Sequence, residues 1–177
     1  ATTTRSSSRS RKRSSPKSRK RFARRKVPHA LMAAHARVPA YASMSFHMAR
    51  AHAKFDAYAH HPYPASPSET PSSGGCKNCP WITMATIRKL LILVKRDFGS
   101  KPIWLTEYGY QTNPPDTFLG VSLKRQATML SLAAMRAWRL PRVTMLFQYL
   151  YRDERVLSRF QTGLVLANDR AKPSLQG

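Results

Sequence analysis

From residue 55 onward, short apolar runs alternate with segments that repeat apolar residues every three or four positions. The runs are FDAYAH (55–60), PIWLTEYG (102–109) and VTMLFQYL (143–150), and the helical segments between them cover about 83–98 and 122–138. Nearly continuous apolar strands separated by amphipathic helices are typical of parallel βαβ units that are buried on both faces. The pattern therefore predicts an α/β fold with three parallel strands, and Gly99 is expected to end the first helix.

The first 54 residues lack this alternation. Residues 1–26 are almost wholly Ser, Thr, Arg and Lys, a composition that predicts a disordered basic arm. Residues 27–54 are rich in Ala, His and Met, and Pro28 and Pro39 interrupt any helix, so an irregular or short-helical leader is expected. Its histidines are irregularly spaced, with no Cys or carboxylate among them, and indicate no metal site. The remaining residues, 55–177, form the predicted α/β region.

The positive charge is concentrated in the N-terminal part of the chain. The net charge is +23, and fifteen of the 31 Lys and Arg residues precede the first acidic residue, Asp56. Such an arm predicts non-specific polyanion binding, and the favoured interpretation is a solvated basic tail or sequence foreign to the ancestral domain. A basic nucleic-acid-binding function is the alternative. No apolar run reaches the ~18 residues of a membrane span, and no signal peptide is visible.

Glu107 is the most informative residue of the α/β region. Strand periodicity places it on one face with Ile103 and Leu105, and Trp104 and Thr106 on the other. It also lies at the C-terminal end of its strand, where catalytic side chains gather in parallel α/β folds. A carboxylate on an apolar face is costly unless it is paired or used. Position alone is equally compatible with a catalytic glutamate and with a structural, ion-paired one.

The amino-acid sequences of several segments resemble one protein family. WLTEYGYQT, VTMLFQYLYRDE, RFQTGL and KPSL resemble, in that order, the seventh and eighth βα units of clan A (β/α)8-barrel glycoside hydrolases, particularly bacterial cellulase-like glycosidases. FDAYAHHPYP resembles the sixth strand of the same barrels. The resemblance covers roughly residues 55–177 and implies a partial TIM barrel of about the last three βα units. It also implies a carbohydrate substrate, no cofactor, and a family that is favoured to be secreted.

The resemblance also implies roles for individual residues in a retaining mechanism. Glu107 matches the nucleophile, while His61 and Tyr63 match positions that hydrogen-bond the nucleophile or the sugar. Further substrate contacts are expected at the mouth of the barrel, from Tyr108, Tyr110, Tyr149 and Asp153. The alternatives are aromatic core residues, and an exposed turn in which Asp153 and Glu154 pair with Arg152 or Arg155.

One essential part of the family's machinery is missing. In clan A the acid/base is the Glu of an Asn-Glu pair on the fourth strand, whereas this chain has no Asn-Glu pair and only three glutamates, Glu69, Glu107 and Glu154. The first five βα units are therefore expected to be absent. Because proton transfer contributes on the order of 10²–10⁴ to rate, we expect the chain alone to be inactive or weak. A non-catalytic carbohydrate-binding remnant is a further alternative.

Cys76 and Cys79 form the only cysteine pair of the chain. A C-x-x-C ahead of a helix is compatible with a redox pair, or with zinc binding together with His60 and His61. A single pair is weak support for either. A local loop disulfide is the favoured prediction, because it fits an exported hydrolase.

Overall fold

The computed structural model describes residues 48–176, and the predictions for the basic arm 1–26 and for most of the leader 27–54 lie outside these residues. Three strands form one sheet in the order β1 (Tyr58–His60), β2 (Ile103–Tyr108) and β3 (Val143–Gln148). Both pairings are parallel, as predicted. Within the described residues the sheet has these three strands and does not close into a barrel.

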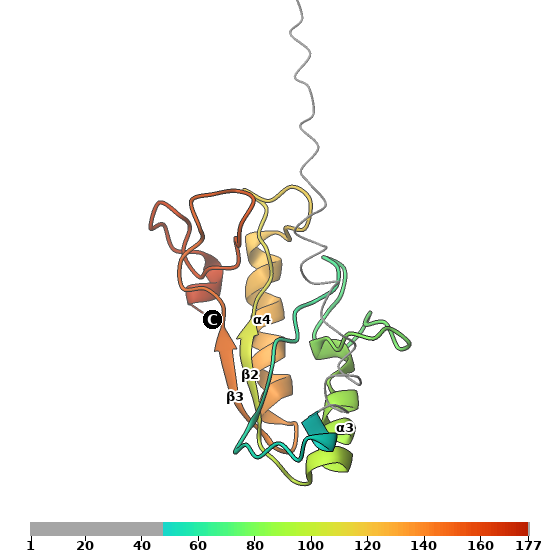
Figure 1. The fold of residues 1–177 in the computed structure, drawn as a ribbon. Helices are drawn as coiled ribbons and strands as arrows, with labels where there is room; N and C mark the ends of the chain where they lie inside the picture. Colours follow the sequence, from blue (N-terminus) through green and yellow to red (C-terminus); the bar gives the residue numbers. More distant parts are fainter. Residues whose placement is uncertain (1–47, 177) are drawn as a thin grey trace, which may run out of the picture.

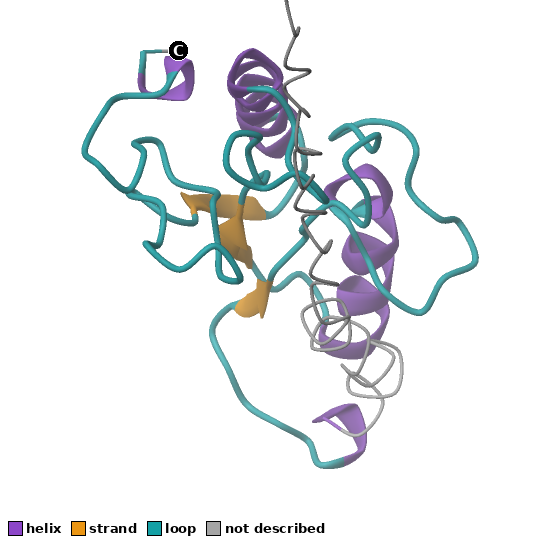
Figure 2. Ribbon diagram, turned by 90° about the horizontal axis from the view of Figure 1, so that it is seen from above, coloured by secondary structure: helices purple, strands orange, loops and turns teal. Residues whose placement is uncertain are grey.

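Two helices connect the strands, α3 (Arg88–Phe98) and α4 (Leu123–Trp138), and both lie on one side of the sheet (Figures 1 and 2). The predicted first helix is preceded by a separate 3-10 turn, η1 (Met84–Thr86), and ends at Gly99, as expected, where the backbone has a positive φ of 76°. The second begins where the hydroxyl of Ser122 accepts a hydrogen bond from the backbone N of Arg125 at 3.2 Å. A short turn, η2 (Pro173–Leu175), packs against α4 near the C-terminus.

The hydrophobic core lies between the sheet and the two helices. Ile103 and Leu105 of β2 are fully buried in one cluster with apolar residues of both helices, which are Leu90, Leu91, Val94, Met129, Ala133 and Ala137. On the other face of the sheet, Trp104 and Met145 are paired in register and remain 39% and 41% exposed. The expectation of a sheet buried on both faces is therefore wrong for the described residues, because the two helices cover the same side.

An irregularity in β2 changes the direction of its last side chains. The register with β3 shifts between Leu105 and Tyr108, and Tyr108 follows Leu105 into the core, where it is 1% exposed. Glu107, whose side chain is 31% exposed, lies outside this buried row. The prediction that Glu107 shares a face with Ile103 and Leu105 is thus wrong. The physical reason is a β-bulge, which adds a residue and breaks the two-residue alternation.

A buried glutamine links α4 to the segments that follow the second and third strands. The Nε2 of Gln126 donates to the backbone oxygens of Tyr110, Thr162 and Gly163 at 3.1, 3.1 and 3.2 Å. Its Oε1 accepts from the hydroxyl of Ser174 in η2 at 2.9 Å. Since both polar atoms of the Gln126 amide have hydrogen-bond partners, this amide fixes the C-terminal loops against the helix. None of the helices within residues 48–176 has the length and apolar character needed to cross a bilayer.

Candidate active site

Glu107 is contacted by two side chains from the segment that follows β1. The hydroxyl of Tyr63 donates to its Oε2 at 3.1 Å, and the Nδ1 of His61 lies 3.5 Å from the same oxygen. β1 and β2 are neighbours in a parallel sheet, so the residues that follow their C-terminal ends meet at one edge. The structure thus brings together the three residues for which the resemblance implied a shared role.

The segment carrying His61 and Tyr63 is anchored on the turn η1. The buried His60 hydrogen-bonds through its Nε2 to the carbonyl oxygen of Ile82 at 2.8 Å, and the backbone N of Met84 donates to the oxygen of Pro62 at 3.0 Å. Because a carbonyl only accepts, Nε2 carries the hydrogen of this bond. Burial lowers the pKa of His60 to about 4, so the imidazole is neutral at neutral pH.

The hydroxyl of Tyr63 is suited to be a donor to the carboxylate. Burial raises the pKa of Tyr63 above its ordinary value, and the negative charge and hydrogen bond of Glu107 raise it further. The phenol therefore stays protonated, and its O–H is directed at Oε2. A charge-assisted hydrogen bond of this kind fixes the orientation of the carboxyl group.

Two more aromatic rings stand beside Tyr63. Tyr149, which follows β3, packs edge-on against Tyr63 with the ring centroids 6.5 Å apart, and Phe160 lies 5.2 Å from Tyr149 and 6.1 Å from Tyr63. Burial raises the pKa of Tyr149, and the negative charges of Glu107 and Glu154 raise it further. Tyr149, for which the resemblance implied a substrate contact, therefore lies beside Tyr63 in the structure.

Phe160 is a residue of the site that sequence reasoning missed. It lies in the loop after the last strand, where neither strand nor helix periodicity assigns a direction to a side chain. The only available signal was its presence in the RFQTGL segment, which entered the resemblance as a run of residues and without a role for the phenylalanine.

Tyr108 and Tyr110 are not brought to Glu107. Both side chains are buried in the core, with their hydroxyl oxygens 3.4 Å apart, and the hydroxyl of Tyr110 donates to the backbone oxygen of Glu69 at 2.9 Å. The expected place of these tyrosines at an open mouth is corrected by this burial. The bulge that moves Glu107 out of the buried row is what moves Tyr108 into it.

Asp153 is also placed differently from the prediction. It is buried, and its Oδ1 accepts from the Nζ of Lys172 at 2.7 Å and from the backbone N of Gly163 at 2.8 Å. Neither a substrate contact nor an exposed pair with Arg152 or Arg155 describes this arrangement. Its partner lies 19 residues away along the chain, so spacing gave no indication of the pair.

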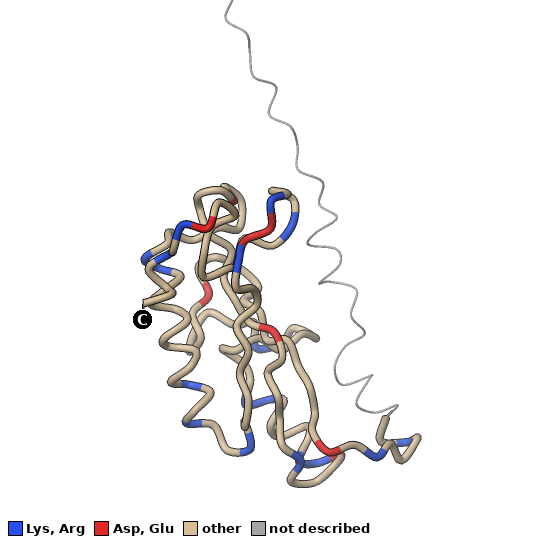
Figure 3. The backbone as a smooth tube through the Cα atoms, turned by 90° about the vertical axis from the view of Figure 1, so that its left-hand side faces the viewer, with Lys and Arg blue, Asp and Glu red and all other residues tan. Residues whose placement is uncertain are grey.

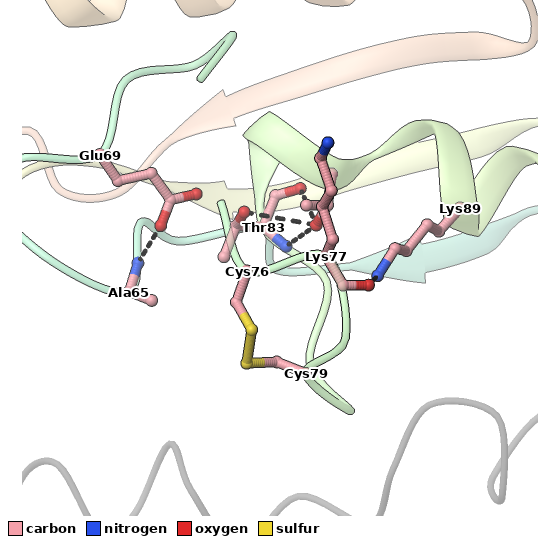
Figure 4. The surroundings of a disulfide bond; sticks show 8 residues. Ala65, Glu69, Cys76, Lys77, Cys79, Thr83 and Lys89 are labelled. Carbon is pink, nitrogen blue, oxygen red and sulfur yellow. Dashed lines mark hydrogen bonds between the residues drawn. A yellow bond between two sulfur atoms is a disulfide. The ribbon is translucent and has the colours of Figure 1, made fainter. Parts of the chain in front are cut away.

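The two cysteines lie in the loop between β1 and η1, and their sulfur atoms are bonded to each other (Figure 4). The same view shows Glu69, whose Oε2 accepts from the backbone N of Ala65 at 2.8 Å, and Lys89, whose Nζ donates to the oxygen of Lys77. In the part of the chain that the structure describes, no group of three or more His, Cys, Asp and Glu side chains is arranged to hold a metal ion.

The fold is similar to part of several glycoside hydrolase structures. A family 39 glycoside hydrolase from Bacteroides cellulosilyticus WH2 matches 74% of this chain and 28% of its own, with 20% identity and a TM-score of 0.57. A GH2 β-galacturonidase from Eisenbergiella tayi, in structures bound to glycerol and to galacturonate, matches 68% of this chain and 22% of its own. These two matches have a TM-score of 0.51 at 14% and 16% identity.

The chain therefore spans about a quarter of the length of the hydrolases that it resembles. No protein-family model matches the chain, and no curated protein matches it by sequence. At these identities the likeness concerns the fold, and the chemistry must be argued from the side chains around Glu107.

Proposed function

We propose that this chain is a glycoside hydrolase-related domain of the clan A type, equivalent to the last three βα units of a (β/α)8 barrel. Glu107 is the nucleophile of a retaining hydrolysis of O-glycosidic bonds. The observation that carries the proposal is the convergence of Tyr63 and His61 on one oxygen of Glu107, at the C-terminal end of the middle strand. In parallel α/β folds this edge is where catalytic residues lie.

The geometry suits a carboxylate that attacks the anomeric carbon. In a retaining reaction the nucleophile forms a covalent glycosyl-enzyme, which water then hydrolyses with the help of a second carboxyl group ~5–5.5 Å away. Tyr63 and His61 both act on Oε2 and so hold the plane of the Glu107 carboxyl group. The partly exposed carboxylate remains accessible to a sugar.

The other two glutamates are both engaged elsewhere. Glu69 is buried and binds the backbone of Ala65, while the Oε2 of Glu154 lies 3.4 Å from a guanidinium nitrogen of Arg159. Neither is arranged as a free acid facing Glu107. We therefore propose that a complete barrel supplies the acid/base, and that the chain alone is inactive or weakly active in full turnover.

The test uses a substrate that does not need the missing acid. A 2,4-dinitrophenyl 2-deoxy-2-fluoro-β-glycoside has a leaving group that departs without protonation, and the fluorine slows hydrolysis of the glycosyl-enzyme, so the covalent adduct accumulates. Intact-protein mass spectrometry should show one added fluoroglycosyl group for at least one sugar among the gluco, xylo and glucurono forms. Glu107→Gln should show none, and the matched control Glu154→Gln should be labelled like the wild type.

Tyr63→Phe adds a second measurement to this test. Because a hydrogen bond to a charged group contributes ~1.5–3 kcal/mol, the variant should be labelled about 10- to 100-fold more slowly at an unchanged final stoichiometry. Equal labelling of the Glu107→Gln variant and the wild type would show that another residue is the nucleophile.

A second candidate function is non-catalytic carbohydrate binding. It is favoured by the three aromatic rings beside Glu107 together with the absence of a free partner acid among the three glutamates of the chain. Saturable binding of a methyl glycoside without any labelling of Glu107 would identify this function.

A further inference from the structure

We infer that Phe160 is a sugar-binding residue of the Glu107 site, with a ring that packs against the C–H face of a pyranoside. This inference rests on the proposed function, since it requires that the site accepts carbohydrate. It assigns the ligand chemistry to a residue of the loop after β3, which the resemblance left without a role.

The ring of Phe160 lies among the aromatic side chains of the site. Phe160 contacts both tyrosines of the site, Tyr149 at 5.2 Å and Tyr63 at 6.1 Å between ring centroids. The hydroxyl of that same Tyr63 donates to Glu107. Three rings from the segments after β1 and β3 therefore meet beside one carboxylate, and Phe160 contributes no polar atom to compete with it. An apolar wall next to a few well-placed polar groups is the usual composition of a small-ligand site.

The backbone next to Phe160 is fixed by hydrogen bonds of a buried neighbour. The next residue, Gln161, is buried, and its side-chain Nε2 donates to the backbone oxygens of Glu154 and Val156 at 3.1 and 3.2 Å. Its backbone N donates to Oε1 of Gln111 at 2.5 Å. Its backbone oxygen accepts from the hydroxyl of Thr112 and from the Nζ of Lys172, each at 3.1 Å.

The neighbouring bonds extend this support. The backbone oxygen of Thr162 accepts from the Nε2 atoms of Gln126 and Gln148 at 3.1 and 2.7 Å. Residues 155–159 are exposed and residues 161–163 are buried, so Phe160 stands where the loop enters the protein. Phe160 as a whole residue is partly exposed, and the backbone that carries it is fixed before any ligand arrives. Such preorganisation lowers the entropy cost of binding.

The chemistry follows from the ring itself. The face of an aromatic ring carries the negative part of its quadrupole, and the C–H groups of a pyranoside carry partial positive charge. A sugar whose C–H face lies on Phe160 presents its hydroxyl groups elsewhere, toward polar side chains such as His61. A filler role for Phe160, in which it only packs against the tyrosines, predicts no dependence of ligand binding on an aromatic ring.

The experiment is a proton NMR titration of the full chain with methyl β-glucopyranoside, methyl β-xylopyranoside and methyl β-glucuronide, which contain no aromatic group. Stacking on Phe160 should move the ring C–H signals of at least one sugar upfield through the ring current. Phe160→Leu should remove these shifts and raise the Kd about three- to tenfold. Phe160→Trp should keep the upfield shifts and the Kd of the wild type. Phe118→Leu is the matched control, because Phe118 is an exposed loop residue outside the three-ring contacts.

The outcomes separate this inference from the proposed function. Upfield shifts that depend on Phe160 and persist in Glu107→Gln support the inference, even if Glu107 is never labelled. Shifts and affinity that are unchanged in Phe160→Leu overturn it, even if labelling of Glu107 succeeds. Absence of any upfield shift in the wild type at saturating sugar also overturns it. Circular dichroism of Phe160→Leu and Phe160→Trp confirms that both variants are folded.

Discussion

His60 couples the candidate site to pH at the scale of a single residue. Its imidazole holds the segment that carries His61 and Tyr63, through the hydrogen bond to the carbonyl of Ile82. Burial lowers the pKa of His60 from 6.5 to about 4; the bond to Ile82 opposes this shift, and the charge of His61 adds to it. The folded protein therefore binds its proton at a lower pH than the unfolded chain does.

Acidification through the range of this shift destabilises the folded protein. Between pH 6.5 and 4 the unfolded chain binds more protons than the folded one, so the free energy of unfolding falls as the pH is lowered through this range. The full effect of the shift below pH 4 is about 3 kcal/mol. Between pH 7 and pH 4.5, the free energy of unfolding measured with urea should fall less in His60→Gln than in the wild type. The glutamine amide does not titrate but can still donate to the carbonyl of Ile82.

The control for this prediction is His61→Gln, which removes an exposed histidine and leaves His60 in place. It should lose stability on acidification much as the wild type does. If His60→Gln and the wild type have the same pH dependence, the buried imidazole is not the group responsible.

Some contacts of the site residues could be predicted from the sequence and others could not. The meeting of Glu107 with His61 and Tyr63 was predictable, because each follows or ends a strand and parallel neighbours bring such residues to one edge. The bulge in β2 was not, since nothing in the letters of PIWLTEYG distinguishes regular alternation from a local extra residue. The same limit explains why Tyr108 was expected at the mouth and is found in the core.

At the scale of elements, the loop after β3 is locked by a buried ion pair. Asp153 and Lys172 are almost wholly inaccessible, and the Nζ of Lys172 also donates to the hydroxyl of Thr112 at 2.8 Å. Burial lowers the pKa of Lys172, and its hydrogen bond to Asp153 opposes that change. The lock joins the loop after β2 to the last segment of the chain, and it also supports Gln161 next to Phe160.

Breaking one side of this lock should be costly. Lys172→Met leaves the carboxylate of Asp153 buried without its cation, and we expect a loss of about 3–5 kcal/mol in the free energy of unfolding. The double variant Asp153→Leu/Lys172→Met should recover part of this loss, because no unpaired charge remains. Arg152→Met, which removes an exposed pair with Asp169, should cost at most about 1 kcal/mol. Equal losses for Lys172→Met and Arg152→Met in urea unfolding would contradict the lock.

Regular elements were the part of the fold most open to prediction. The second helix, expected at about 122–138, is found at Leu123–Trp138, because a serine cap and a long apolar repeat both mark it. The first strand is shorter than FDAYAH, and the first helix is preceded by a 3-10 turn. The lock and the Gln126 hub were not predictable, since both join residues from distant loops that share no periodicity.

At the scale of the whole molecule, the basic arm without acidic residues and the candidate site lie in different parts of the chain. Residues 1–26 contain twelve of the 31 Lys and Arg residues and no acidic residue, whereas all 8 acids lie from Asp56 onward. In the described part, Lys and Arg are spread over both helices and the loops, with acidic residues among them (Figure 3). The candidate site of Glu107, Tyr63 and Phe160 belongs wholly to residues 55–177. Polyanion binding and sugar recognition should therefore be separable by deletion.

Deleting residues 1–26 reduces the net charge from +23 to +11, because it removes twelve positive charges and no negative one. The full chain should bind a labelled single-stranded oligonucleotide with a log Kd that rises with log salt, at a slope of about 0.7 per neutralised phosphate. The deletion should reduce this slope and weaken binding. A full-length variant in which the twelve Lys and Arg residues of 1–26 are replaced by Gln should behave in the same way. In both variants the ring-current shifts of the methyl glycosides and the labelling of Glu107 should match the full chain. Oligonucleotide binding that is insensitive to salt would show that the arm acts through more than its charge. Sugar shifts that disappear with the arm would show that the arm is part of the sugar site.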